Sequence, residues 1–111
     1  MAQTITTRTL RFISDPGHGW LEVRLKDLHT LSCELDISNY SYFRQPQGMA
    51  YLEEDRDASV FFTAAKAAGW QITVDESYQA ITFVRNCPSY GRYKAAIKEL
   101  ASIRRNMEGA A

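Results

Sequence analysis

Alternating apolar and polar residues near the start of the chain predict a β-hairpin. Residues 8–14 (RTLRFIS) have the composition of a strand, and residues 20–25 (WLEVRL) alternate apolar with charged side chains from Leu21 onward. Between them, residues 15–19 (DPGHG) contain one proline and two glycines, which force a turn. We therefore expect two paired strands with a structured tip.

The same kind of pattern predicts two more hairpins. Residues 40–44 (YSYFR) and 49–53 (MAYLE) are aromatic-rich runs separated by the turn residues 45–48 (QPQG). Residues 70–74 alternate apolar with polar side chains, and residues 80–85 (AITFVR) follow after Asp-Glu-Ser. These runs are interpreted as the second and third hairpins.

Helical periodicity marks three other segments. Within residues 26–35 the leucines recur at spacings of three and four, which is typical of a short amphipathic helix. Residues 58–68 carry an apolar stripe, and Gly69 follows as the left-handed residue that commonly ends a helix. A last helix begins after Pro88, with Ser89 as its cap, and places four residues on one side: Tyr93, Ile97, Leu100 and Met107.

The order of these elements predicts the fold class. Three ββα units in succession favour an α+β domain, with an antiparallel sheet built from hairpins and with the helices packed on it, over a parallel βαβ arrangement. We expect residues 1–111 to form one domain, with residues 1–7 and 109–111 frayed at its ends.

Composition narrows the class of protein. Of the 111 residues, 45% are apolar and 23% charged, which is typical of one folded domain and disfavours a disordered chain. The start of the chain lacks the basic and apolar regions of a secretory signal, and no run is long enough for a membrane span. We therefore expect a cytoplasmic protein without membrane contact.

The balance of charge argues against one large class of partner. Thirteen Lys and Arg residues offset thirteen Asp and Glu residues, so the formal net charge is zero. No whole-molecule field attracts polyanions, which disfavours nucleic acid as a general partner and also disfavours an acidic mimic of DNA.

The predicted hairpin tip is the first candidate site. Its small residues let a ligand approach the backbone, while Asp15, His18 and Trp20 supply a carboxylate, an imidazole and a flat apolar anchor. The structural alternative is a tight turn in which Asp15 caps local amides and Trp20 packs on the core. As chemistry, Asp15 orienting His18 would make a general base, but no nucleophile motif or paired metal ligands accompany them. We predict no catalytic residue, cofactor or metal.

A run of acidic residues is the second candidate site. Asp55 or Asp57 can cap the helix that follows, and one such cap satisfies the helix start. With Glu53 and Glu54, which end the preceding strand, the run holds more carboxylates than a cap needs. The surplus suits an Arg-rich surface on a partner protein, or less well a hard cation, because the spacing does not match a calcium-binding loop.

Three tyrosines form the third candidate site. Tyr40 and Tyr42 fall on one face of a predicted strand, and Tyr51 on the paired strand joins them. Such a face can be an aromatic platform for a protein or for bases, or simply a half-buried sheet surface. Combined with the basic residues of the last helix, this face is the basis of an alternative function, nucleic-acid binding. Those basic residues are Lys94, Lys98, Arg104 and Arg105.

Four segments of the chain stand out together: FISDPGHGWLEV, YSY, YLEEDRDAS and VRNCPSY. They resemble segments of a family of small uncharacterised proteins carried by bacterial plasmids, prophages and other mobile elements. The chain departs from that family at residues 75–87, where members often have a histidine and an aromatic residue near position 87, here Cys87. Because mobile elements carry inhibitors of host defence, including anti-CRISPR proteins, the resemblance implies such an inhibitor by analogy.

Together these features rank three functions. The first is a non-catalytic protein-binding accessory protein whose partner is a host protein or protein complex. The second is a nucleic-acid binder that uses the tyrosine face and the last helix. The third is a small enzyme centred on Asp15 and His18.

The two cysteines generate a first testable prediction. Cys33 and Cys87 lie far apart and in no metal-binding or redox spacing, so we expect both to be reduced structural thiols. The unfolding free energy should therefore be the same with and without reductant. A native disulfide would contribute about 2 to 4 kcal/mol, so a loss of that size on reduction would contradict the prediction.

Overall fold

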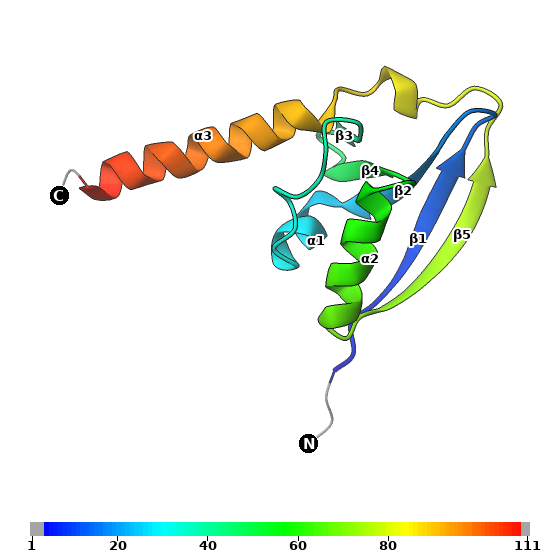
Figure 1. Ribbon diagram of the computed structural model, residues 1–111, viewed down its shortest axis with the longest axis horizontal. Coiled ribbons are helices and arrows are strands. Elements are labelled where there is room, and N and C mark those ends of the chain that lie inside the picture. The colour runs from blue at the N-terminus through cyan, green and yellow to red at the C-terminus, as the bar shows by residue number, and fades with distance from the viewer. Residues whose placement is uncertain (1–3, 110–111) are drawn as a thin grey trace.

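The computed structural model describes residues 4–109 of the chain. These residues form one five-stranded sheet and three α-helices (Figure 1). The strands are β1 (Thr7–Ser14), β2 (Gly19–Arg24), β3 (Tyr42–Arg44), β4 (Met49–Glu53) and β5 (Gln71–Tyr78). The helices are α1 (Leu25–Thr30), α2 (Asp57–Ala67) and α3 (Tyr90–Gly109), with a short 3-10 turn at Val84–Asn86. Among the described residues, none of the helices combines the length and the apolar character that crossing a membrane requires.

The first two predicted hairpins are confirmed. β1 and β2 pair antiparallel with Phe12 opposite Leu21, and β3 and β4 pair antiparallel with Tyr42 opposite Tyr51. β2 also pairs antiparallel with β4, which joins the two hairpins into one sheet with the strand order β3-β4-β2-β1-β5. The α+β class is therefore correct.

The prediction of a purely antiparallel sheet is wrong, because β5 pairs parallel to β1 and forms the edge of the sheet opposite β3. All eight residues of β5 pair with β1, from Gln71 beside Thr7 to Tyr78 beside Ser14. A parallel pair requires a crossover connection, and α2 supplies it by carrying the chain from β4 across the sheet to β5. The sheet is consequently mixed.

The third hairpin, and with it the third ββα unit, is also wrong. β5 continues through the Asp-Glu-Ser segment that we expected to be a turn. Residues 79–89 then fold back over the sheet, and within them Val84 is fully buried while Phe83 packs beside it. Those apolar residues cover the sheet and do not extend it, which the apolar pattern alone does not distinguish.

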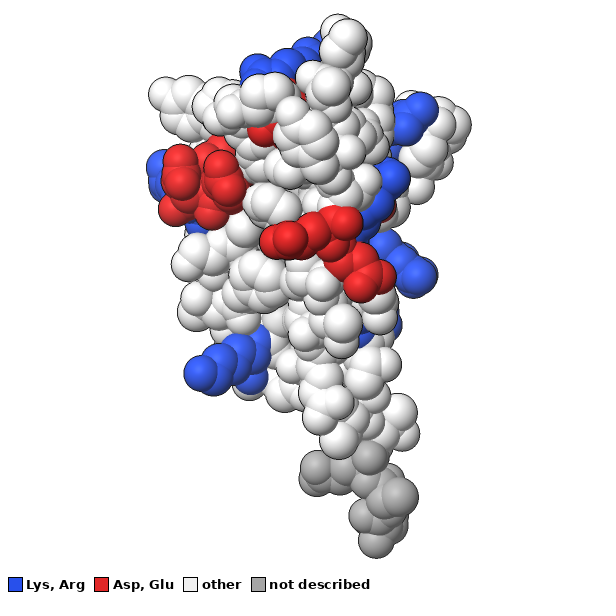
Figure 2. Space-filling model, turned by 90° about the vertical axis from the view of Figure 1, so that its right-hand side faces the viewer, with Lys and Arg blue, Asp and Glu red and all other residues white. Residues whose placement is uncertain are grey.

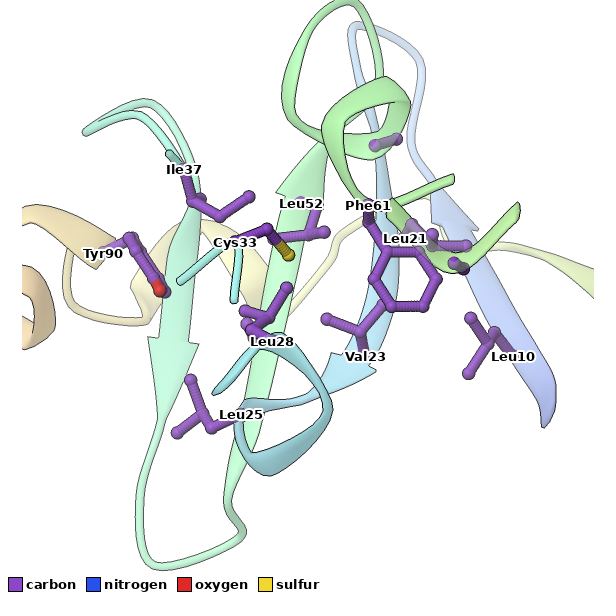
Figure 3. Close-up of a cluster of buried hydrophobic side chains, with 13 residues drawn as sticks. Leu10, Leu21, Val23, Leu25, Leu28, Cys33, Ile37, Leu52, Phe61 and Tyr90 are labelled. Carbon is purple, nitrogen blue, oxygen red and sulfur yellow. The ribbon is translucent and has the colours of Figure 1, made fainter. Parts of the chain in front are cut away.

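The main core lies between the sheet and the helices α1 and α2. Figure 3 shows Phe61 of α2 reaching toward Leu21 and Val23 of β2, with Leu28 of α1 beside them. Helix α1 is shorter than predicted, because Ser32 adopts a left-handed conformation (φ 58°) that turns the chain after Thr30.

A smaller core lies on the opposite face of the sheet. The alternation along β2 and β4 sends Trp20 and Tyr51 to this side, where they meet Ile13 of β1 and Val84. The main core holds Cys33, and Cys87 borders the smaller one; both are free thiols. Burial raises the pKa of Cys33 to about 11, so its reactive thiolate form is disfavoured at neutral pH.

Helix α3 begins on the main core and then leaves it. Tyr90 is fully buried, and its hydroxyl donates a hydrogen bond of 2.6 Å to the carbonyl of Glu34. Ser89 caps the helix as predicted, by accepting the backbone N–H of Gly91. Beyond its first turns the helix projects from the body of the protein (Figure 1), and Leu100 remains 59% exposed. The predicted apolar stripe is correct, but only its first half is covered.

The chain ends that we expected to be frayed are only partly described. Residues 1–3 and 110–111 lie outside the described residues. Of the rest, Thr7 is the first residue of β1, and Gly109 is the last residue of α3.

The end of α2 generates a second prediction. Gly69 has φ +78°, a conformation that costs residues with a side chain about 1 to 2 kcal/mol. Gly69→Val should therefore lower the unfolding free energy by at least that amount, while Gly109→Val at the exposed end of α3 should change it little. Denaturant unfolding of both variants measures the difference, and equal midpoints would contradict the assigned helix end.

Candidate functional site

Three of the predicted candidate segments meet at one pocket of about 350 Å³, which we call the aromatic pocket. It is formed by the tip of the first hairpin, the segment around β3, the turn between β4 and α2, and the 3-10 turn. Its lining residues are His18, Trp20, Tyr40, Tyr42, Glu53, Asp55 and Arg85. Six of these seven are residues that the sequence singled out, and Arg85 is the exception.

Asp15 lies behind this pocket and acts as a structural anchor. Its carboxylate accepts the backbone N–H groups of Gly17 and His18, each at 2.9 Å, and the hydroxyl of Thr82 at 3.3 Å. Arg85 donates two further hydrogen bonds, at 2.6 and 2.9 Å. The bonds from Arg85 hold the pKa of Asp15 well below its usual range. The tight-turn alternative for Asp15 is therefore confirmed, and its carboxylate is fully engaged.

Arg85 is the residue that sequence reasoning missed. Its guanidinium lies 5.3 Å from the centre of the Trp20 ring and is clamped there by Asp15. The sequence pattern assigned Arg85 to a strand, and no local pattern relates it to an aspartate 70 residues earlier. The fold-back of residues 79–89 is what brings the two side chains together.

Aromatic rings make the walls of the pocket. Trp20 is only 2% exposed and packs on the smaller core, as its structural alternative expected. The rings of Tyr42 and His18 lie 6.3 and 6.1 Å from it, centre to centre. Tyr40 precedes β3 and is 78% exposed, so it borders the pocket as a free wall. A ligand in the pocket would therefore contact several aromatic rings at once.

Tyr51 does not share this surface. It lies opposite Tyr42 in the sheet, but it is 1% exposed, and the ring of Phe83 covers it at 5.3 Å. Burial raises its pKa to about 12. The predicted platform of three surface tyrosines is therefore not formed, and Tyr40 and Tyr42 remain as its accessible part.

The roles within the acidic run differ from those predicted. Glu53 accepts the backbone N–H groups of Asp55 and Arg56, at 2.8 and 3.2 Å, and so closes the turn before α2. Among residues 4–109, no side chain caps the first amides of α2, so the prediction of Asp55 or Asp57 as the cap was wrong. Glu53, the last residue of β4, accepts the backbone amides of this turn instead, because the chain turns sharply between β4 and α2.

Asp57 is buried and holds the tyrosine segment in place. Its carboxylate accepts the backbone N–H of Ser38 at 3.1 Å and the hydroxyls of Ser38 and Ser41. Ser41 in turn accepts the backbone N–H of Glu53. Asp57 thereby fixes both sides of the pocket, and the carboxylates of Glu54 and Asp55 remain exposed.

The chemistry of the pocket favours a cation. Glu53 and Asp55 line it with negative charge, and the charge of Arg85 is matched by Asp15. Aromatic faces attract cations through the ring quadrupole, and carboxylates add charge-assisted hydrogen bonds. Within residues 4–109, no three His, Cys, Asp or Glu side chains are grouped as a metal site would require.

Comparisons with known proteins give no further indication of what the pocket binds. A scan against protein-family models, a search of curated proteins and a search of solved structures each find no match to the chain. The similarity to mobile-element proteins therefore stays a prediction.

The anchor behind the pocket generates a third prediction, on pH. A carboxyl group whose pKa is lower in the folded state stabilises the fold above its unfolded pKa of about 3.9, and loses that contribution as the pH falls toward the folded value. Asp15→Asn should therefore be less stable than the wild type by a constant amount between about pH 5 and 7, and the gap should narrow below about pH 4.

Urea unfolding across this pH range measures the gap. Asp75→Asn is the matched control, because Asp75 is exposed and forms no ion pair with a described residue. A gap that stays constant down to about pH 2 would contradict the stabilising role of the Asp15–Arg85 pair.

Proposed function

We propose that this protein is a non-catalytic binding module whose aromatic pocket receives a cationic side chain of a partner protein. One observation carries the proposal: exposed tyrosine, buried tryptophan and two carboxylates converge on a single pocket from separate parts of the chain. Asp57 and Asp15 hold those parts in place before any partner arrives. Such preorganisation reduces the entropy lost on binding.

Arginine fits the pocket better than lysine. Its flat guanidinium can stack on a ring while it bonds a carboxylate through two N–H groups, whereas an ammonium is a compact, strongly hydrated point charge. Within the chain, Arg85 already stacks on one face of Trp20 in this way. Cation–aromatic contacts are worth about 0.5 to 1 kcal/mol at exposed sites, so the pocket would contribute to a larger interface and would not bind alone with high affinity.

The resemblance to mobile-element proteins directs the search for that partner. It suggests a host protein or protein complex, and by analogy an inhibitor of a host defence system of the anti-CRISPR type. Opposite charge across the interface would speed association and make it sensitive to salt.

The competing functions receive less support from the same contacts. A nucleic-acid-binding surface would lack Tyr51, because this side chain is buried in the core. Lys94, one of the basic residues of the last helix, donates a hydrogen bond to the carbonyl of Ile37 within the fold. On the side of the molecule where β5 lies, acidic and basic side chains are interspersed without a continuous basic surface (Figure 2). An enzyme centred on Asp15 and His18 would need the carboxylate that Arg85 occupies.

The fourth prediction tests the pocket directly with small probes. Trp70→Phe leaves Trp20 as the single tryptophan, whose indole resonance can be followed by NMR. N-acetyl-arginine amide should shift that resonance with a dissociation constant of about 1 to 10 mM, N-acetyl-lysine amide more weakly, and N-acetyl-glutamate amide not at all.

The matched variants make this test specific. Tyr40→Ala with Asp55→Asn should abolish the shift, because it removes one wall and one carboxylate. Tyr78→Ala with Asp75→Asn changes an exposed tyrosine and an exposed aspartate on β5 and should leave the shift unchanged. Equal shifts from arginine and glutamate probes would refute the pocket as a cation site.

Pull-down from a bacterial lysate with the same two double variants then identifies the partner. The protein sought is one that the wild type and the β5 control retain and that the pocket variant loses. Retention of nucleic acid with a steep loss on adding salt would support the nucleic-acid function instead.

A further inference from the structure

A second and larger cavity, of about 840 Å³, lies between α3 and the body of the protein. One wall is the N-terminal part of α1 together with the β3–β4 turn, and the other wall is α3 itself. We call it the α3 groove. It shares no lining residue with the aromatic pocket, so an occupant would not compete with the cationic side chain proposed above.

The floor of the α3 groove is apolar. It is lined by Leu25 of α1 and Met49 of β4 on the side of the body, and by Tyr93, Ile97 and Leu100 on the side of α3. Because α3 leaves the body after its first turns, Leu100 is 59% exposed, and Ile103 and Met107 farther along are 46% and 72% exposed. Large apolar side chains left exposed beside a groove often mark an interaction site.

The rim of the α3 groove is basic. Arg24 and Lys26 stand on one wall and Arg104 on the other, and none of the three forms an ion pair with a described residue. Glu34 is the one carboxylate among the described residues of the same rim; it lies 2.8 Å from His29 Nδ1 in a hydrogen bond, and the three cations outnumber it. The groove thus combines an apolar floor with net positive edges.

We infer that the α3 groove binds an amphipathic helix of a partner protein whose apolar face is flanked by aspartate and glutamate. Tyr93, Ile97, Leu100 and Arg104 recur at spacings of four, three and four, so they form a ridge along one face of α3, against which a second helix can pack. From Tyr93 to Arg104 this ridge runs about 16 Å, roughly three turns of the bound helix. A helix also satisfies its own backbone hydrogen bonds, which the apolar floor does not.

Charge decides between a partner protein and a second copy of this chain. The projecting half of α3 carries Lys98, Arg104 and Arg105 against Glu99 and Glu108. These three cations outnumber the two carboxylates, so that half would gain no net attraction from Arg24 and Lys26 in the groove of another copy. An acidic helix instead gains attraction at the rim, as well as burial of its apolar face.

The fifth prediction tests the groove with defined peptides. The probe is a fluorescein-labelled 18-residue helical peptide with leucines at spacings of three and four and glutamates flanking them, and its partner peptide has lysine in place of every glutamate. Fluorescence anisotropy should show that the glutamate peptide binds at least about tenfold more tightly than the lysine peptide, with an affinity that falls as salt rises.

Three single variants of the full chain locate the binding. Leu100→Asp and Arg104→Glu should each weaken the glutamate peptide at least about tenfold, since one disrupts the floor and the other the rim. Lys98→Glu makes the same charge change outside the groove and should alter the affinity by less than about threefold. The Tyr40→Ala, Asp55→Asn variant should bind the peptide normally, which separates this result from the fate of the aromatic pocket.

Several outcomes would overturn the inference. Failure of the glutamate peptide to bind, or equal binding of the lysine peptide, would show that rim charge does not select the occupant. An equal effect of Lys98→Glu would indicate attraction by net charge alone. Analytical ultracentrifugation is the remaining check, since a dimer that Leu100→Asp dissociates would identify a second copy as the occupant.

Discussion

β5 runs parallel to β1 along eight residue pairs, and its last residue, Tyr78, therefore lies beside Ser14 at the tip of the first hairpin. This pairing requires α2 to cross the sheet, which is how Phe61 comes to cover one face of it. It also delivers residues 79–89 to the hairpin tip, where Arg85 meets Asp15. From there the chain crosses the second face of the sheet and starts α3 beside β3. The aromatic pocket and the α3 groove both depend on this route.

Two buried aspartates then convert the route into a defined site. Asp15 binds the last third of the chain to the first hairpin, and Asp57 binds the segment around Tyr40 to α2. Buried carboxylates are stabilising only when several donors surround them, and each of these aspartates is bound by several donors. Their carboxylates bind donors within the fold, so the negative charge available to a partner comes from the exposed carboxylates nearby.

The two candidate surfaces are opposite in charge and separate in place. The aromatic pocket is lined by carboxylates and suits a cation, whereas the α3 groove is rimmed by Arg24, Lys26 and Arg104 and suits an acidic helix. A chain with zero net charge can hold both, because local patches and not the total charge govern such contacts. If one partner engages both sites, binding at the first would make binding at the second intramolecular and so raise its effective concentration.

What the sequence by itself determined was local. Alternation along β2, turn residues at the hairpin tip, and the glycine after α2 depend on neighbours only a few positions apart, so these elements could be predicted. From the sequence, Trp20, Tyr42 and Asp55 were predicted only as members of three separate candidate sites, not as neighbours in one pocket.

Tertiary structure decided the parallel pairing of β5, the ion pair of Arg85 with Asp15 and the burial of Asp57 and Tyr51. It also decided that Leu100, which lies on the same apolar stripe as Tyr93, stays uncovered. Each of these outcomes depends on contacts between residues far apart in the chain, for which a local pattern carries no signal.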